Sequence, residues 1–309
     1  MWQVVFDSLA PVFLTIAVGA ALRRLAFLPP GFFGGLNQLA FWVCLPCMLF
    51  TEIARCRVAG GDVIRVTELI ALTVAPTLAA AWVLVHILRV PRPSRSAFLQ
   101  GAVRGNLAYV GLPVIVYALA AMPNAGGRAA MVLAPLTVLY NVLGVLLLTK
   151  RGEGGGWQRW RPAFRGIVTN PLIISCVLGL AAFWWQVSLS PTLGKTVEML
   201  GKAGLPVALL ALGASLTFER VRGHFWLATA ASLVRVGVGP AVGWGLAAAF
   251  GVAGDWRTLM LLFLACPTAV ASYVMADQMG ADKDLAGAIV VLSTLYSFPA
   301  MAAVLLLAR

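Results

Sequence analysis

Residues 104–114 read RGNLAYVGLPV, and they interrupt a segment whose flanks, "SAFLQGAV" and "IVYALA", are strongly apolar. In a helix interior, glycine costs about 1 kcal/mol and proline about 3 kcal/mol relative to alanine. An arginine at the centre of a bilayer costs about 2.5–3.5 kcal/mol on insertion scales. This stretch therefore predicts a helix that breaks, at a place where the chain needs polar groups.

Composition defines the class of protein. Hydrophobic residues make up 61% of the 309 residues and charged residues 11%, whereas soluble domains carry about 45–50% and 25%. We predict an all-α polytopic membrane protein whose surroundings are the lipid bilayer. The net charge of +12 does not indicate a nucleic-acid partner, because most basic residues lie in short loops between apolar runs. The start, "MWQVVFDSLAP", lacks a basic leader, so we interpret it as a retained first span.

Apolar runs long enough to cross the membrane predict ten transmembrane segments. Their expected ranges are 5–22, 34–53, 63–88, 96–120, 127–149, 167–187, 194–217, 224–250, 257–279 and 284–307. The loops that follow the odd-numbered segments collect more Lys and Arg than the other loops, although "RCRVAGGDVIR" runs against this trend. The positive-inside rule then places these loops in the cytoplasm and both termini outside the plasma (inner) membrane.

The two halves of the chain repeat a pattern. "PVFLTIAVG" begins at Pro11 and "PLIISCVLG" begins at Pro171, 160 residues later, and "LPCML" at Leu45 and "LPVAL" at Leu205 share that spacing. We predict a first five-helix repeat in 1–150, a cytoplasmic linker in 151–166 and a second five-helix repeat in 167–309. Because five is odd, the second copy must enter the membrane from the opposite face, which is an inverted repeat typical of transporters.

The fourth predicted segment has an interrupted counterpart in the ninth, where Asn106 corresponds to Cys266. That segment reads "ACPTAVASYVM" and contains Pro267, Thr268 and Ser272. We expect Pro113 and Pro267 each to begin a second half-helix, since proline fits the first turn. Two half-helix N-termini would then meet near the bilayer centre and favour an anion. Gly105 lies at the first break, and the Asn106 amide would add a donor.

The chain resembles the auxin efflux carrier family in "GNLAYVGLPV", "CPTAVASYVMADQMG", "GKAGLPVALLALGASL" and "VRVGVGPAV". The resemblance implies ten helices, with a scaffold of helices 1, 2, 6 and 7, a mobile transport part of helices 3–5 and 8–10, and crossed helices 4 and 9. It also implies elevator-like transport in homodimers, with Asn106 contacting a substrate carboxylate and Pro113 and Pro267 marking the crossing. Plant members carry Asn-Pro-Asn where this chain reads "TNPLIIS", so Leu172 replaces the second Asn.

Two arginines and two acids within the predicted segments have open roles. Arg104 either clamps a carboxylate or neutralises the C-terminal end of the first half-helix. Because an unpaired buried arginine is costly, we expect Arg235 to form a structural ion pair, with Glu68 as the best-placed acid. Glu68 could otherwise respond to protons, or lie at the interface beside Arg65. Asp277 is expected to pair with Lys283 or to be solvated.

Enzymatic chemistry is not expected. "CLPC" at 44–47 resembles a redox motif, but the second repeat keeps only its proline, Pro206. No cysteine spacing indicates zinc or a disulfide framework, and no phosphate-binding loop is present, so no metal or cofactor is predicted.

The sequence predicts a secondary transporter or facilitator for a small organic anion, most simply a carboxylate. The substrate-binding residues would be Arg104, Gly105, Asn106, Pro113, Pro267, Thr268 and Ser272, and coupling to protons or to sodium stays open. One alternative is a sodium-coupled symporter of the bile-acid type, which shares this general architecture. Another is a membrane receptor that binds an anion without moving it.

Overall fold

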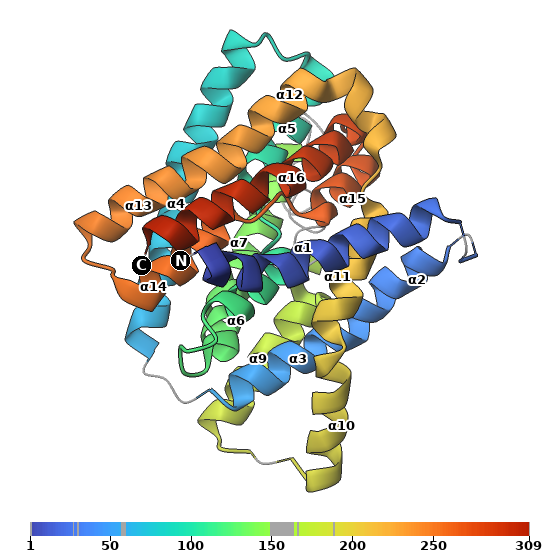
Figure 1. Cartoon of the computed structure of the whole chain (residues 1–309). Coiled ribbons are helices and arrows are strands. Elements are labelled where there is room, and N and C mark those ends of the chain that lie inside the picture. The colour runs from blue at the N-terminus through green and yellow to red at the C-terminus, as the bar shows by residue number, and fades with distance from the viewer. Residues whose placement is uncertain are drawn as a thin grey trace.

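The computed structural model is built from helices (Figure 1). It describes residues 2–26, 28–29, 31–56, 60–148, 164–165, 167–187 and 189–308. Within these ranges the only extended pairing is one isolated bridge, between Gly105 and Thr268. The predicted all-α class is therefore confirmed, whereas the predicted linker lies outside the described residues apart from 164 and 165.

The first half contains the following elements: α1 (Trp2–Arg24), α2 (Phe32–Leu39), η1 (Ala40–Cys44), α3 (Leu45–Ala54), α4 (Gly60–Ile87), η2 (Arg92–Ser94), α5 (Arg95–Val103), η3 (Leu107–Gly111), α6 (Leu112–Ala118) and α7 (Ala125–Leu148). The second half contains α9 (Pro171–Trp184), α10 (Pro191–Lys202), α11 (Gly204–Ser215), η4 (Phe218–Arg220), α12 (Val221–Leu233), η5 (Val234–Val238), α13 (Gly239–Ala249), α14 (Gly254–Ala265), α15 (Val270–Gln278) and α16 (Lys283–Leu307).

Seven helical stretches in the described chain have the length and hydropathy to cross a membrane: Val5–Arg24, Phe32–Ala54, Gly61–Ile87, Ala125–Leu148, Pro191–Ser215, Phe218–Ala249 and Lys283–Leu307. Two shorter apolar helical stretches, Leu107–Ala118 and Pro171–Trp184, accompany them. The chain is therefore a multi-pass membrane protein, as its composition predicted.

Three helical stretches contain a π-helical turn directly before a proline. The turns η1, η3 and η5 come just before Pro46, Pro113 and Pro240, which lie in the first turn of α3, α6 and α13. Proline has no N–H and its ring clashes with the preceding turn. The wider π-turn accommodates that ring without ending the helical stretch.

Two groups of helices can be followed in Figure 1. In one group, α1 packs on α11, α11 on α2, and α3 on both α9 and α10. A Cβ at Gly19 or Gly213 would overlap with a carbonyl oxygen of the facing helix, so α1 and α11 approach backbone to backbone. Such close contacts between small residues are typical of helices that pack inside membranes.

In the second group, α4, α5, α12, α15 and α16 share one apolar cluster, in which Phe98, Ala228 and Ile289 are fully buried. The helix α13 packs on both α4 and α14, and α7 contacts α3 as well as α4, α5 and α6. In Figure 1, α12, α15 and α16 lie above α3, α9 and α10, and the start of α1 lies close to the end of α16.

Candidate functional site

Two helices of the second group stop in the middle of the apolar core. The helix α5 ends at Val103 and η3 begins at Leu107, while α14 ends at Ala265 and α15 begins at Val270. The backbone between them is extended, with ψ of 107° at Arg104 and 151° at Cys266. Both interruptions fall where glycine, proline and polar residues interrupt the apolar sequence.

The two interruptions pair with each other as a short antiparallel ladder. The N–H of Asn106 donates to the carbonyl of Pro267 over 2.7 Å, and the N–H of Ala269 donates to the carbonyl of Arg104 over 3.1 Å. Gly105 lies opposite Thr268. Non-helical backbone at membrane depth must find internal partners, and each break supplies them to the other.

Thr268 ties the second break to two further helices. Its N–H donates to Ser293 Oγ over 2.9 Å, and its hydroxyl donates to the carbonyl of Gly101 over 2.7 Å. Thr268 is fully buried. The Thr268 hydroxyl therefore donates its hydrogen bond within the protein. Together with the backbone N–H, it holds α14 and α15 against α5 and α16.

The prolines occupy different places relative to the breaks. Pro113 lies in the first turn of α6, as predicted, although helical structure already begins at Leu107. Pro267 lies in the extended break, three residues before α15 begins. The predicted first-turn position is therefore wrong for Pro267, because its carbonyl is used to pair the two breaks.

Arg235 reaches the second break from η5 and is 1% exposed. Its Nε donates to the carbonyl of Cys266 over 3.1 Å, and its Nη2 donates to the carbonyl of Phe263 over 2.9 Å. These carbonyls lie at the C-terminal end of α14, where the helix dipole is negative. The guanidinium therefore caps a broken helix.

The predicted ion pair between Arg235 and Glu68 is wrong. Glu68 is exposed on α4 and takes part in none of the ion pairs of the described chain. Carbonyl groups freed by the helix break supply the negative partial charge that we expected from a carboxylate. The predicted pair between Asp277 and Lys283, in contrast, is confirmed at 2.9 Å.

Gly105 makes room for the buried guanidinium. A Cβ at this position would overlap with Arg235 Nη2 and would lie 2.9 Å from its Cζ and 3.0 Å from Cys266 Sγ. Any side chain at Gly105 would displace the arginine that caps α14.

Arg104 reaches toward α7 and α15. Its Nη2 donates to Asn141 Oδ1 over 2.7 Å, and its Nη1 contacts Met275 Sδ. Neither partner is charged, and within the described ranges no carboxylate lies at ion-pair distance, so the expected anionic partner is absent there. Arg104 is 9% exposed, which leaves a nearly buried positive charge without a counter-ion.

Polar atoms without a partner surround the paired breaks. Asn106 Nδ2, Ser272 Oγ and Gln100 Oε1 are buried and have no hydrogen-bond partner in the described structure. Gln100 Nε2 instead contacts Met275 Sδ over 3.6 Å. Such orphaned groups are rare in native interiors and signal a missing ligand or water.

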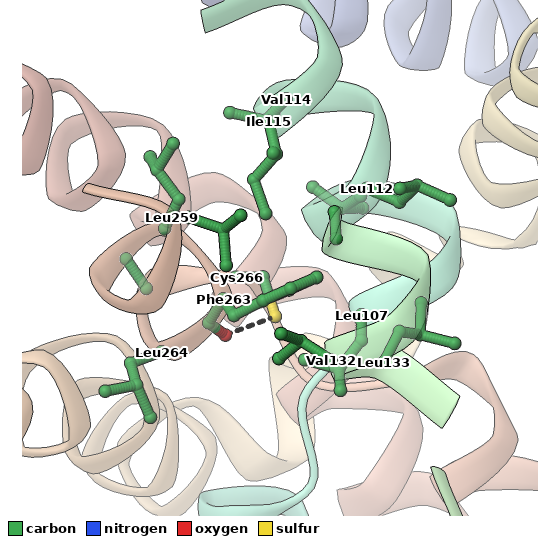
Figure 2. Packing of buried hydrophobic residues seen from close by; sticks show 14 of the residues in the cluster. Leu107, Leu112, Val114, Ile115, Val132, Leu133, Leu259, Phe263, Leu264 and Cys266 are labelled. Atoms are coloured by element: carbon green, nitrogen blue, oxygen red, sulfur yellow. Dashed lines mark hydrogen bonds between the residues drawn. The ribbon is translucent and has the colours of Figure 1, made fainter. Parts of the chain in front are cut away.

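Apolar side chains enclose the paired breaks, as Figure 2 shows for Phe263 and Cys266 facing Leu107 and Leu112. The Cys266 thiol donates to the carbonyl of Phe263 over 2.9 Å. Electrostatic attraction is stronger in such surroundings than in water. Two cavities, of about 240 Å³ beside α3 and α10 and about 170 Å³ beside α4 and α14, include none of the break residues.

Sequence reasoning missed three residues of this cluster: Gln100, Asn141 and Met275. Asn141 carried a usable signal, because it is a lone amide in the apolar run "LTVLYNVLGVLLL". Met275 carried none, because an apolar side chain in an apolar helix gives no sign of an arginine partner.

A polar site enclosed in a multi-pass helical protein, with interrupted helices around it, defines a membrane transport protein. Comparison with known proteins shows the particular family. The sequence profile described as "Membrane transport protein" matches residues 4–155 and 160–305, so the chain belongs to this family, which includes the auxin efflux carriers. Its members are membrane transporters and not enzymes, and the resemblance predicted from sequence is confirmed.

Three relatives illustrate the range of the family. The chain is 26% identical over 314 residues to a "Putative malonate transporter" of Rhizobium meliloti (strain 1021), covering 97% of this chain and 94% of the relative. It is 25% identical over 298 residues to an "Uncharacterized transporter" of Methanothermobacter thermautotrophicus, covering 94% of each chain. It is 27% identical over 142 residues to "Auxin efflux carrier component 3" of Arabidopsis thaliana, covering 45% of this chain and 22% of the relative.

Proposed function

We propose that this membrane transporter is a secondary transporter or facilitator for a small organic anion, a carboxylate, which binds at the paired breaks. The observation that carries the proposal is the nearly buried Arg104 guanidinium, which has no carboxylate partner in the described structure. A ligand carboxylate would supply the missing negative charge through charge-assisted hydrogen bonds. The relative named "Putative malonate transporter" supports an organic anion as the ligand class.

Three kinds of donor would hold the carboxylate. Arg104 would supply charge, and the orphaned Nδ2 of Asn106 would supply a neutral donor. The first turns of η3 and α15 begin beside the paired breaks, and their unpaired N–H groups and dipoles favour an anion. Arg235 would act indirectly, because its hydrogen bonds to Phe263 and Cys266 fix the end of α14.

The architecture we propose has ten transmembrane segments in a 5+5 inverted repeat, 1–150 and 167–309. The interruptions that follow α5 and α14 support it, because each lies in the fourth helical segment of its half. The prolines Pro46 and Pro206 also support it, because they lie at corresponding places in the two halves. Pro46 lies at the start of α3, after η1, and Pro206 lies at the start of α11, after α10.

We also propose that the helices divide into two parts that move relative to each other, as in an elevator. The scaffold would hold α1–α3 and α9–α11, and the mobile part would hold α4–α7 and α12–α16. The most extensive helix contacts, α1 with α11, α3 with α9 and α12 with α16, each lie within one of the two parts and support this division. We also propose that the protein forms a homodimer. Both termini of each chain would lie outside the inner membrane.

Contacts between helix ends support the proposed grouping of these ends on the two sides of the membrane. Arg23 donates to the carbonyl of Ala214 and Arg220 pairs with Asp284, and all four residues lie at ends assigned to the cytoplasm. Arg55 pairs with Glu198, which joins two ends assigned to the outside.

Uptake into proteoliposomes tests the proposal, with malonate and succinate as probes and choline as the cationic control. We expect uptake of a dicarboxylate and no uptake of choline. Repeating the assay with and without sodium, and with and without a pH gradient, separates the alternatives. Uptake that requires sodium would favour the symporter, and saturable binding without uptake would favour a receptor. Absence of both binding and uptake for every carboxylate would overturn the proposal.

A further inference from the structure

The end of α3 packs tightly on the first turn of α7 through two glycines. A Cβ at Gly127 would lie 2.6 Å from the carbonyl oxygen of Glu52 and 2.9 Å from Cys56 Cβ. A Cβ at Gly126 would overlap with the carboxylate of Glu52. The sequence "AGGR" at 125–128 thus permits a contact that no larger residues would allow.

Glu52 lies directly against the N-terminal end of α7. Its Cδ would be 2.8 Å and its Oε1 3.3 Å from a Cβ at Gly126. The side chain is half-buried, and within the described chain no cation lies at ion-pair distance from it. The first N–H groups of a helix have no intrahelical acceptors and carry a partial positive charge, so the helix end favours the ionised carboxylate.

The charged neighbours of Glu52 contact other groups. On its own helix, Arg55 pairs with Glu198 over 2.8 Å, and Glu198 also pairs with Lys202 of α10 over 2.9 Å. On α7, the guanidinium of Arg128 lies 5.2 Å from the ring centre of Trp256. The other titratable groups on the helices packed here are Cys56 and Cys47 of α3, Cys176 of α9 and Lys195 of α10.

We propose that Glu52 is a proton-binding site that controls the contact between α3 and α7. The ionised carboxylate holds the positive end of α7 against α3. When Glu52 takes up a proton, that attraction is lost, and the tight glycine contact can open.

This inference rests on the proposed function, because α3 belongs to the scaffold and α7 to the mobile part. Opening of their junction would release the mobile part at its outer end. Because no cation in the described chain lies at ion-pair distance from Glu52, the attraction between its charge and the helix end is what a bound proton would remove. Glu68, for which the sequence suggested a proton response, lies exposed on α4 and does not touch this junction.

Cys56 provides a natural reporter, because its thiol lies 3.0 Å from the position of a Gly127 Cβ and is fully buried. We would measure its alkylation by a maleimide in the purified full chain at one fixed pH, by mass spectrometry. Glu52→Gln mimics the protonated state and should label at Cys56 at least fivefold faster than wild type. Glu68→Gln makes the same chemical change on the exposed face of α4, away from this junction, and should leave the rate unchanged. Cys176 and Cys266 serve as internal references.

Equal or slower labelling of Cys56 in Glu52→Gln would overturn the inference. A second measurement covers the case in which this variant does not fold. Hydrogen exchange of the first-turn amides of α7 in the wild-type chain, corrected for intrinsic rates, should be at least fivefold faster at pH 5 than at pH 8. No change would also overturn the inference. Neither measurement requires transport, so failed uptake with faster labelling would count against the proposed function alone.

Discussion

Replacing Gly105 by alanine should destabilise the protein through a residue that belongs to another helix. The added methyl group would overlap with Arg235 Nη2 and lie 2.9 Å from its Cζ. The guanidinium must move, which weakens its bonds to the carbonyls of Phe263 and Cys266 at 2.9 and 3.1 Å. A hydrogen bond to a charged group contributes about 1.5–3 kcal/mol, so partial loss of two should cost about 2–4 kcal/mol.

Thermal unfolding of the purified protein in detergent measures this cost. For domains of about 150–250 residues, 1 kcal/mol shifts the midpoint by about 2–4 °C, so Gly105→Ala should lower Tm by roughly 4–16 °C. Gly237→Ala is the matched control, because Gly237 lies two residues from Arg235 and a Cβ there meets no atom within 4 Å. This control should leave Tm unchanged or raise it slightly, since alanine favours helix.

A double-variant cycle identifies the cause of the destabilisation. Arg235→Gln alone should also be destabilising, because it leaves buried carbonyls without their charged donor. In Gly105→Ala/Arg235→Gln the shorter amide leaves space for the methyl group, so the two effects should fall short of additivity by about 1 kcal/mol or more. If Gly105→Ala were as stable as wild type, or if its effect on stability added strictly to that of Arg235→Gln, the proposed displacement of Arg235 would be refuted.

Three further predictions concern the two arginines, the moving parts and the topology. Arg235→Gln should lower thermal stability by about 3–5 kcal/mol, whereas Arg104→Gln should mainly weaken substrate affinity; the reverse pattern would require exchanging their roles. A disulfide between Cys56 and a cysteine at Gly127→Cys should stop transport until a reductant is added, and full transport by the cross-linked protein would contradict an elevator that moves α7 past α3. A cysteine at Thr192→Cys should react with an impermeant thiol reagent from outside intact cells, and reaction only in inside-out vesicles would reverse the orientation.

Matched controls exist for the last two experiments. Gly101→Cys/Ile289→Cys joins α5 to α16 within the proposed mobile part, and the Cβ separation of 3.5 Å suits a disulfide. This cross-link should leave transport intact. A cysteine at Arg92→Cys lies in the exposed loop assigned to the cytoplasm and should label only after the cells are opened.

The sequence predicted the helix interruptions because their signal is local. Glycine, proline and an arginine inside an apolar run are costly in a continuous helix, so Arg104, Gly105 and Pro267 identified both breaks. Their equivalent positions in the two halves also suggested that they would meet. The hydrogen bonds that pair them, such as Asn106 N–H to Pro267, could not be predicted, because strand-like pairing of short breaks leaves no periodic pattern.

The partners of the buried charges were beyond sequence reasoning. The sequence predicts a carboxylate near Arg235, but the carbonyls of Phe263 and Cys266 accept its hydrogen bonds instead. Every residue has a backbone carbonyl, so the sequence does not single out these two. Glu52 was overlooked because it lies near the end of an apolar segment, where a solvated carboxylate is the usual expectation. Only its contact with Gly126 distinguishes it.

The central claim is that the paired breaks bind the carboxylate through Arg104 and Asn106. Malonate affinity of the purified protein, measured by titration calorimetry, tests it most directly if malonate is the anion taken up. Arg104→Gln should weaken binding at least tenfold with little loss of Tm, and Asn106→Ala should weaken it by a smaller factor. Arg92→Gln, which removes the same charge from the surface, should bind as wild type does. Wild-type affinity in both Arg104→Gln and Asn106→Ala would contradict the claim and place the site elsewhere.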